Sequence, residues 1–468
     1  MFVVVLNQIK FIYYDILSIM LSRSGYLIPL TSDDVKTIKK DLTIRPIINN
    51  EFGFPPPPFK VFKETKKNIC VPRFYGLEHF KKSCEDNRPE PTRVVFQFHG
   101  KLRDETFQNE ALEKAVSAGH GVLSLPCGYG KTTVALAIAA RLGLRTMIVV
   151  HKEFLANQWR ERIHQFCPGA TIGIVQQDKI EINCDFVIAM LQSLSLKEYS
   201  FDQFESIGTL FVDEAHHVCA RVFSQSLFKL CPRHVYGLSA TPERKDGLTK
   251  VLHWFLGPTF FSVERENQKQ VCVFPIDFDC KLFNDPPPCN KTGKVSLVHM
   301  ITDLVNHDER NRMLVSLIQK IIKECSTRQI LVLSDRRLHC EYLHSQFPEI
   351  SGLYMGGMKE ADLEQTSRCQ IIFGTFSQAH EGLDIPTLDT VLLVTPKSDI
   401  KQSIGRILRE TTGKKNDPHI YDILDKWSLL YAMYQKRRRV YKEGGFLMND
   451  SEPPPVVNEF KGKCLLTL

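Results

Sequence analysis

A glycine-rich turn followed by Lys131 and Thr132 most constrains what this chain of 468 residues can fold into. An apolar run at residues 121–125 precedes the turn, and an Ala- and Leu-rich segment, 132–142, follows it. This order predicts a buried strand, a tight turn and a helix whose N-terminus binds phosphate. One position departs from the full phosphate-loop pattern, because Leu125 stands where a glycine is usual.

The residues of this turn predict how a nucleotide is held. Gly128 and Gly130 give the backbone the freedom that a phosphate cradle needs. Lys131 is expected to reach the β- and γ-phosphates of ATP, and Thr132 to bind Mg²⁺, with Thr133 in the same site.

A second apolar run, residues 209–212, ends at Asp213 and Glu214. Ligands of open α/β sheets bind beyond the carboxyl ends of the strands, so both carboxylates are expected beside the nucleotide. Asp213 is predicted to hold Mg²⁺ and Glu214 to polarise the attacking water, which are the groups that phosphoryl transfer requires.

Three later segments complete a recognisable order. Ser239 and Thr241 come first, residues 374–384 follow, and Arg406 and Arg409 close the series. The two arginines are three residues apart and share a helix face, and their guanidinium groups suit a γ-phosphate on which charge develops. The five segments in this order predict an NTP-hydrolysing motor of two similar α/β domains.

The set resembles the superfamily 2 helicases, and most closely the XPB-like, DEAH-box-type branch of DNA helicases, with relatives in phages and large DNA viruses. The resemblance covers residues 102–425. It implies two tandem RecA-like parallel-sheet domains with a small N-terminal accessory region. It also implies ATP and Mg²⁺ as cofactors, DNA as the nucleic acid, and travel in the 3′-to-5′ direction.

The same resemblance implies roles for single residues. Those near the nucleotide are Gln108, which would contact adenine, and Gly382, Asp384 and Gln402. Ser239 and Thr241 would couple the nucleotide state to the grip on the strand. The implied nucleic-acid contacts are His151, Gln192, Ser193 and Thr375.

Changes in pattern predict the domain layout. The predicted segments are an apolar extension at 1–19, an accessory module at 20–100, a RecA-like ATP-binding domain at 101–263, a linker or insertion at 264–298, a second RecA-like domain at 299–445 and a flexible tail at 446–468. Met20 is an alternative start. Residues 94–98 read as a strand, and the aromatic and basic segment 71–77 is expected to pack on the first domain rather than to touch DNA.

Composition limits the class of protein. Charged residues make up 24% of the chain and hydrophobic ones 43%, which are ordinary values for a folded protein. The net charge of +7 permits nucleic-acid binding without demonstrating it. Lys10 and Asp15 interrupt the apolar N-terminus and argue against a membrane span. We therefore expect a soluble intracellular protein, with nucleus or cytoplasm and any protein partners undetermined.

Several alternatives stay open. The chain could translocate on duplex DNA or remodel protein–DNA complexes without unwinding, it could be a nucleic-acid-binding scaffold with a vestigial ATPase, or its track could be RNA. The basic run 436–439 could grip phosphate, serve as a nuclear import signal, or form the solvated face of a final helix with Tyr431, Met433 and Tyr434 turned inward.

Overall fold

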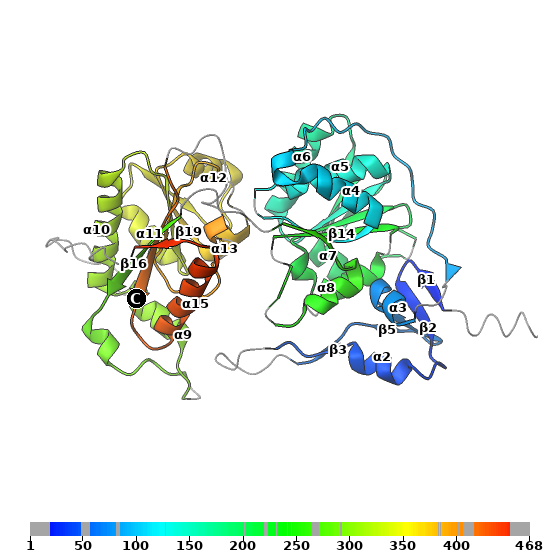
Figure 1. The fold of residues 1–468 in the computed structure, drawn as a ribbon, viewed down its shortest axis with the longest axis horizontal. Coiled ribbons are helices and arrows are strands. Elements are labelled where there is room, and N and C mark those ends of the chain that lie inside the picture. Colours follow the sequence, from blue (N-terminus) through cyan, green and yellow to red (C-terminus); the bar gives the residue numbers. More distant parts are fainter. Residues whose placement is uncertain are drawn as a thin grey trace, which may run out of the picture. The chain divides into compact units, whose positions relative to one another are not determined.

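The structure is a computed structural model, and it divides into two compact units, Met1–Glu264 and Arg265–Leu468 (Figure 1). It describes residues 19–47, 57–80, 85–126, 128–200, 202–219, 223–230, 232–240, 242–244, 246–263, 271–290, 293–381, 383, 385–400, 403–405 and 416–449. Each unit is built on a parallel sheet with helices on both faces, so the predicted α/β fold is confirmed.

The sheet of the first unit has eight strands in the order β11-β10-β12-β9-β13-β14-β8-β15. The strands are β8 (His120–Ser124), β9 (Thr146–Val150), β10 (Ile172–Gln176), β11 (Lys179–Ile180), β12 (Phe186–Met190), β13 (Thr209–Asp213), β14 (His234–Ser239) and β15 (Thr259–Ser262). All pairs are parallel except β10 with β11. Both faces of the central strands are buried, which explains why they read as continuous apolar runs.

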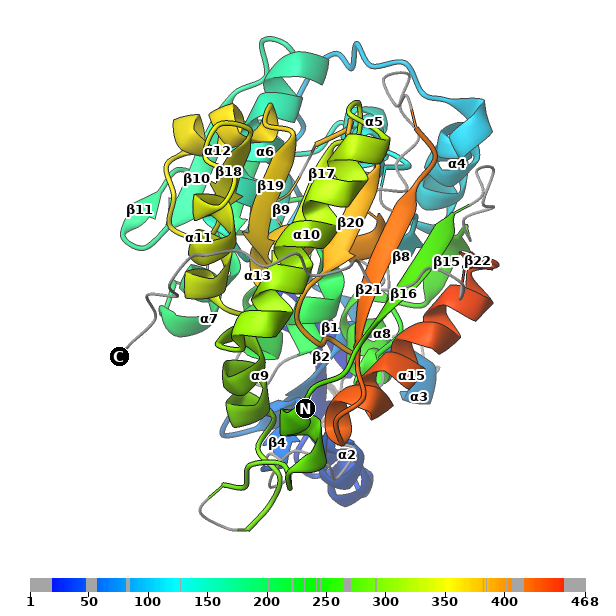
Figure 2. The same ribbon diagram turned by 90° about the vertical axis from the view of Figure 1, so that its left-hand side faces the viewer.

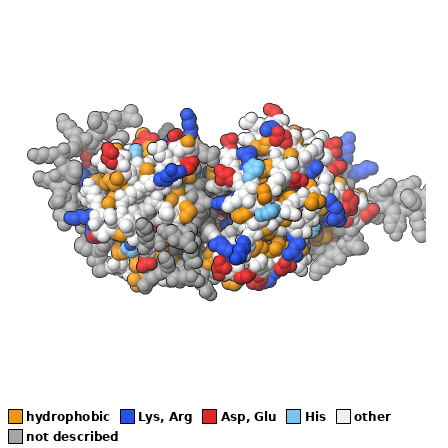
Figure 3. All heavy atoms as spheres, turned by 90° about the horizontal axis from the view of Figure 1, so that it is seen from above, with side chains coloured by type: hydrophobic (Ala, Val, Ile, Leu, Met, Phe, Trp, Pro, Cys, Tyr) orange, Lys and Arg blue, Asp and Glu red, His pale blue; other side chains and the backbone are white. Residues whose placement is uncertain are grey.

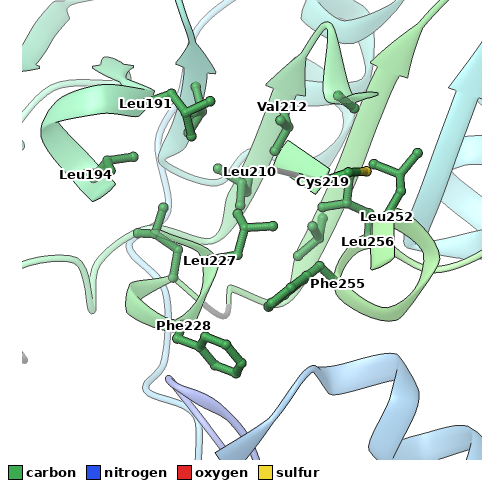
Figure 4. Close-up of a cluster of buried hydrophobic side chains, with 14 of the residues drawn as sticks. Leu191, Leu194, Leu210, Val212, Cys219, Leu227, Phe228, Leu252, Phe255 and Leu256 are labelled. Carbon is green, nitrogen blue, oxygen red and sulfur yellow. The ribbon is translucent and has the colours of Figure 1, made fainter. Parts of the chain in front are cut away.

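Helices cover both faces of this sheet. They are α4 (Gln108–Ala118), α5 (Lys131–Leu142), α6 (Glu153–Phe166), α7 (Leu191–Leu196) and α8 (Thr249–Leu256). The first three share one core with the sheet, and α7 and α8 share another. Figure 4 shows that second core, in which Leu191 of α7, Val212 of β13 and Phe255 of α8 belong to one cluster.

The accessory region packs against this domain. Its elements are β1 (Met20–Ser22), β2 (Gly25–Pro29), α2 (Val35–Asp41), β3 (Thr43–Ile44), β4 (Phe59–Lys60), β5 (Lys63–Glu64), β6 (Asn68–Val71), α3 (Arg73–Phe80) and β7 (Glu85–Asp86). Tyr75 of α3 meets Trp254 of α8 edge-on at 5.4 Å, and Phe74 lies 4.5 Å from the ring of His120. The prediction that segment 71–77 packs on the first domain is confirmed.

The second unit has a seven-stranded parallel sheet in the order β18-β19-β17-β20-β21-β16-β22. The strands are β16 (Cys272–Phe278), β17 (Ile330–Ser334), β18 (Ser351–Tyr354), β19 (Ile371–Thr375), β20 (Thr390–Leu393), β21 (His419–Asp425) and β22 (Leu447–Met448). The helices are α9 (Leu297–Val305), α10 (Asp308–Glu324), α11 (Arg337–Ser345), α12 (Glu360–Ser367), α13 (Phe376–Glu381) and α15 (Leu429–Glu443). Figure 2 looks onto this unit, with α10 and α11 in front of the sheet and α13 and α15 in the opposite core.

Two segments expected to be irregular are strands. Within the predicted linker 264–298, β16 pairs along its whole length with β21. Loss of period and the prolines at 286–288 favoured a linker here, and Pro275 within the strand is tolerated because the paired residues of β22 end at Val273. Within the predicted tail, β22 pairs with β16, and Asn449 N–H donates to the Val273 carbonyl at 2.8 Å. Both pairings join residues far apart in sequence, so local pattern did not reveal them.

The expected strand at residues 94–98 is wrong, because this segment is an extended strap without ladder pairing. Val94 N–H donates to the Gly143 carbonyl at 3.0 Å, and Phe96 packs 4.7 Å from Phe186. The alternation of apolar residues thus reflects packing on the surface of the first domain.

The basic run 436–439 is not the solvated face that was one of its readings, because only Arg439 in it is exposed and Arg437 is buried. Arg437 is 2% exposed and forms a buried ion pair with Asp422, whose carboxylate also accepts from Tyr441 at 2.7 Å. Tyr434 is buried as expected, whereas Tyr431 is exposed. A buried arginine must be paired, so Arg437 is a structural residue and does not grip phosphate.

A chain of hydrogen bonds fixes the turn after β17. Arg336 N–H donates to Ser334 Oγ at 3.2 Å, and the Ser334 hydroxyl lies 3.0 Å from Nδ1 of His339. Nε2 of that histidine lies 3.1 Å from Asn311 Oδ1 on α10. This is a structural network, because Ser334 and His339 are both buried.

In the described part of the chain, no helix is both long and apolar enough to cross a membrane.

Candidate nucleotide-binding site

The carboxyl edge of the first sheet brings three predicted segments together. β13, β14 and β8 are consecutive neighbours, and they lead into the acidic box, into Ser239 and into the phosphate loop. Leu125 N–H donates to the Ser239 carbonyl at 3.2 Å, which ties the loop to the end of β14. Parallel strands end at one edge, so this convergence follows from the topology.

The phosphate loop has the backbone that its glycines were expected to allow. Gly128 and Gly130 have φ angles of 89° and 77°, in the left-handed region. A Cβ on Gly130 would lie 2.4 Å from Nε2 of Gln108, so a larger residue does not fit there. α5 begins at Lys131, whose ammonium donates to the Leu125 carbonyl at 3.2 Å. Thr132 and Thr133 follow in the first turn of α5, where helix N–H groups can meet phosphate.

The side chain of Gln108 fixes the phosphate loop through hydrogen bonds. Its amide donates to the Tyr129 carbonyl at 2.9 Å and accepts from Arg103 N–H at 3.0 Å. The Arg103 guanidinium reaches the Gly128 carbonyl at 3.2 Å. Four residues separate Arg103 from Gln108, and a short 3₁₀ turn (Asp104–Thr106) accommodates them. Both side chains therefore reach the phosphate loop, although four residues separate Arg103 from Gln108.

The acidic box is held by a residue that the motif reading did not assign. The indole N–H of Trp159 on α6 donates to Asp213 Oδ2 at 2.8 Å, and Glu214 N–H donates to Oδ1 at 2.9 Å. Glu214 itself has a φ of 46°, a strained value for a residue with a side chain. A buried indole N–H usually has a hydrogen-bond acceptor, and this rule could have indicated that Trp159 bonds to a nearby carboxylate.

Burial and the Glu214 charge raise the pKa of Asp213, so two neighbouring carboxylates lie where negative charge is costly. That donor set fits a divalent cation, which would offset the charge. In the described residues, no group of three or more His, Cys, Asp or Glu side chains forms a metal cage.

An arginine braces the turn after the acidic box. Arg244 donates to the His216 carbonyl at 2.7 Å and binds both oxygens of Asp246. Nδ1 of His216 lies 3.3 Å from Ser239 Oγ, so the predicted coupling residue does contact the acidic box. On the accessory side, Ile47 N–H donates to the Asp246 carbonyl at 3.0 Å.

The predicted nucleic-acid contacts lie at sheet edges in both units. His151 follows β9 and is buried, and its carbonyl accepts from the Gln192 amide on α7 at 2.5 Å. Ser193 is also buried, and its hydroxyl accepts from Gln177 N–H at 2.9 Å. Thr375 ends β19 in the second unit, beside Ser334 of β17.

Figure 3 shows basic and acidic side chains interspersed on one face, without separation by sign.

Six predicted site residues lie outside the described residues. They are Thr241, Gly382, Asp384, Gln402, Arg406 and Arg409. All the described residues that were predicted to bind the nucleotide therefore lie in the first unit.

Comparison with known proteins supplies the family. Residues 101–244 match the family described as "Type III restriction enzyme, res subunit". The chain is 32% identical over 451 residues to a mimivirus protein named "Putative ATP-dependent RNA helicase L396", covering 90% of this chain and 84% of that one. It is 30% identical over 389 residues to "Putative helicase 161L" of invertebrate iridescent virus 6, covering 76% and 84%.

Among solved structures, the chain is similar to the crystal structure of T4 UvsW, with 14% identity over 90% of this chain and 95% of that one. The TM-score is 0.34, which is too low to establish a shared fold. The matches to the two viral proteins cover 90% and 76% of this chain, so each includes residues of both units. The chain therefore belongs to the superfamily 2 helicases, and it is an ATP-hydrolysing enzyme of that family.

Proposed function

We propose that this protein is a DNA helicase or translocase of the XPB-like branch that moves in the 3′-to-5′ direction and is driven by ATP hydrolysis. One observation carries the ATPase part of the proposal. The Lys131 loop, the Asp213–Glu214 box and Ser239 converge on one sheet edge, and each is fixed by hydrogen bonds. The DNA track and the direction rest on the resemblance of the motifs.

In the proposed reaction, the glycine turn and the N-terminus of α5 bind the phosphates of ATP, and Lys131 neutralises charge on the β- and γ-phosphates. Glu214 orients and polarises the attacking water. Thr132 and Asp213 would hold Mg²⁺, which supplies positive charge for the transferring phosphoryl group. Gln402, Arg406 and Arg409 are proposed to complete the site from the second RecA-like domain, residues 299–445.

The nucleic acid is proposed to contact His151, Gln192, Ser193 and Thr375. The side chains of His151 and Ser193 are buried. At these two residues, backbone groups of the segment would therefore contact the nucleic acid. Contacts of this kind read phosphates rather than sequence, which suits a motor. The enzyme is proposed to act inside the cell, where both ATP and nucleic acid occur.

RNA is the second candidate track, because the mimivirus relative is named an RNA helicase. The first experiment is therefore ATP hydrolysis by the full chain alone and with single-stranded DNA, duplex DNA or single-stranded RNA. Stimulation by DNA above RNA supports the proposal, and the reverse order assigns RNA. Lys131→Ala should abolish hydrolysis in every arm.

Two further readouts separate the remaining alternatives. Displacement of a labelled strand from a duplex with a 3′ tail, but not from one with a 5′ tail, supports a 3′-to-5′ helicase. Stimulated hydrolysis without displacement points to a duplex translocase or a remodeller. Nucleic-acid binding without hydrolysis under any condition would instead indicate a scaffold.

A further inference from the structure

Three histidine rings, His216, His217 and His151, lie in contact one after another beside the acidic box, with neighbouring ring planes tilted by 37° and 33°, and this row is called the histidine stack below. The ring centroids of His216 and His217 are 4.4 Å apart, and those of His217 and His151 are 4.0 Å apart. His216 and His217 belong to the short turn after β13, whereas His151 follows β9. Because β9 and β13 are neighbours, the stack bridges the ends of two adjacent strands.

Each end of the stack contacts a segment with an assigned or proposed role. At one end, Nδ1 of His216 lies 3.5 Å from Glu214 Oε2 and 3.3 Å from Ser239 Oγ. At the other end, the carbonyl of His151 accepts from the Gln192 amide at 2.5 Å. An unbroken series of contacts thus leads from the acidic box to α7.

The surrounding core makes this series stiff. Val212 and Cys219, on either side of the histidine turn, belong to the same buried cluster as Leu191 and Leu194 of α7 (Figure 4). Close-packed interiors transmit small displacements instead of absorbing them.

The rings are packed as neutral groups. Burial lowers the pKa of His216 to about 4 and that of His217 to about 3, and it also lowers the pKa of His151. Near neutral pH the stack therefore acts through shape and ring contact, without mutual charge repulsion.

We propose that His217 is a positioning residue that couples the nucleotide site to the nucleic-acid-binding segment at Gln192. This rests on the proposed function, in which nucleic acid stimulates ATP hydrolysis. When the acidic box shifts with the nucleotide state, His217 moves against His151, and the His151 carbonyl carries the shift to the Gln192 amide. Loss of the ring should uncouple the two sites without removing a group that touches ATP.

The test measures two coupling ratios in the full chain. One is the ratio of nucleic-acid-stimulated to basal hydrolysis, and the other is the change in nucleic-acid Kd on adding a non-hydrolysable ATP analogue. In His217→Ala, each ratio should move at least about fivefold closer to one. This is the expected size because coupling between two sites typically changes an affinity by a factor of about five or more. His217→Phe keeps a flat ring and should retain most of the coupling. His164→Ala, an exposed histidine of α6, is the matched control and should change neither ratio.

Opposite outcomes overturn the inference. Folded His217→Ala with both ratios within twofold of wild type would do so, as would equal losses in His217→Ala and His217→Phe. If His217→Ala unfolds, His217→Leu keeps side-chain bulk without the flat ring and takes its place, with the same expected loss and the same refutation. A wild-type protein that no nucleic acid stimulates would instead overturn the proposed function, and the inference with it.

Discussion

Replacing Gln108 by Ala tests how the phosphate loop is held. Gln108 is 2% exposed, and its amide makes two hydrogen bonds, to the Tyr129 carbonyl and from Arg103 N–H. A hydrogen bond contributes about 0.5–1.5 kcal/mol net, so losing both should cost about 2 kcal/mol. If that loss falls on the loop conformation that binds ATP, the Kd for ATP should rise about 30-fold.

The assay is equilibrium binding of a fluorescent ATP analogue to full-length protein, with Asn109→Ala as the control. Asn109 is the neighbouring amide and is exposed, so its removal should change the Kd less than twofold. A Kd within twofold of wild type in Gln108→Ala would refute the reasoning, because the two bonds would then contribute nothing to nucleotide binding.

The same variant separates two roles of Gln108. The resemblance assigns it to adenine, whereas the structure shows it bonded to the loop. If it only holds the loop, ATP and GTP should weaken by the same factor. If it also reads the base, ATP should weaken more, and discrimination between the two nucleotides should fall.

Three further outcomes are expected. Trp159→Phe removes the hydrogen bond to Asp213 and should lower kcat about tenfold in an ATPase assay of the folded protein, and because Trp159 is buried the smaller ring should also cost about 1–3 kcal/mol of stability. Arg437→Met leaves Asp422 buried without its partner and should cost about 3–5 kcal/mol in urea unfolding, whereas the exposed Arg439→Met should change it by less than about 0.5 kcal/mol. Burial, and to a smaller extent the Arg310 charge, lower the pKa of His339 from 6.5 to about 3. Below pH 6.5, His339 is therefore protonated in the unfolded chain but stays neutral in the folded chain. Stability should therefore fall as pH drops from about 6.5 towards 3, and His339→Gln should lose less than wild type between pH 7 and pH 5.

Sequence reasoning succeeded where a function depends on a short stretch of chain. The strand, glycine turn and helix around Lys131 are contiguous, and so is the strand that ends at Asp213. In such segments apolar runs and glycine placement determine the local backbone, and the topology of a parallel sheet then brings the loops to one edge. The fold class, and the meeting of the Lys131 and Asp213 segments at one sheet edge, could therefore be predicted.

Sequence reasoning failed where a residue depends on a distant partner. The stretch that holds β16 lacks a clear period and is followed by the prolines at 286–288, which favours a linker, yet β21, more than a hundred positions later, completes the ladder. Arg437 was read within a basic run because its partner, Asp422, lies on another element. Composition and periodicity do not contain these pairings.

The acidic box combines both situations. Asp213 and Glu214 are recognisable from four letters, but their geometry depends on Trp159 on α6, Ser239 on β14 and Arg244 beyond it. These residues come from separate elements and hold the turn that places Glu214 at a positive φ. A strained turn persists only when its surroundings over-determine it. Substitutions around the box, as well as those within it, should therefore change hydrolysis, and Trp159→Phe is the most direct measure of that dependence.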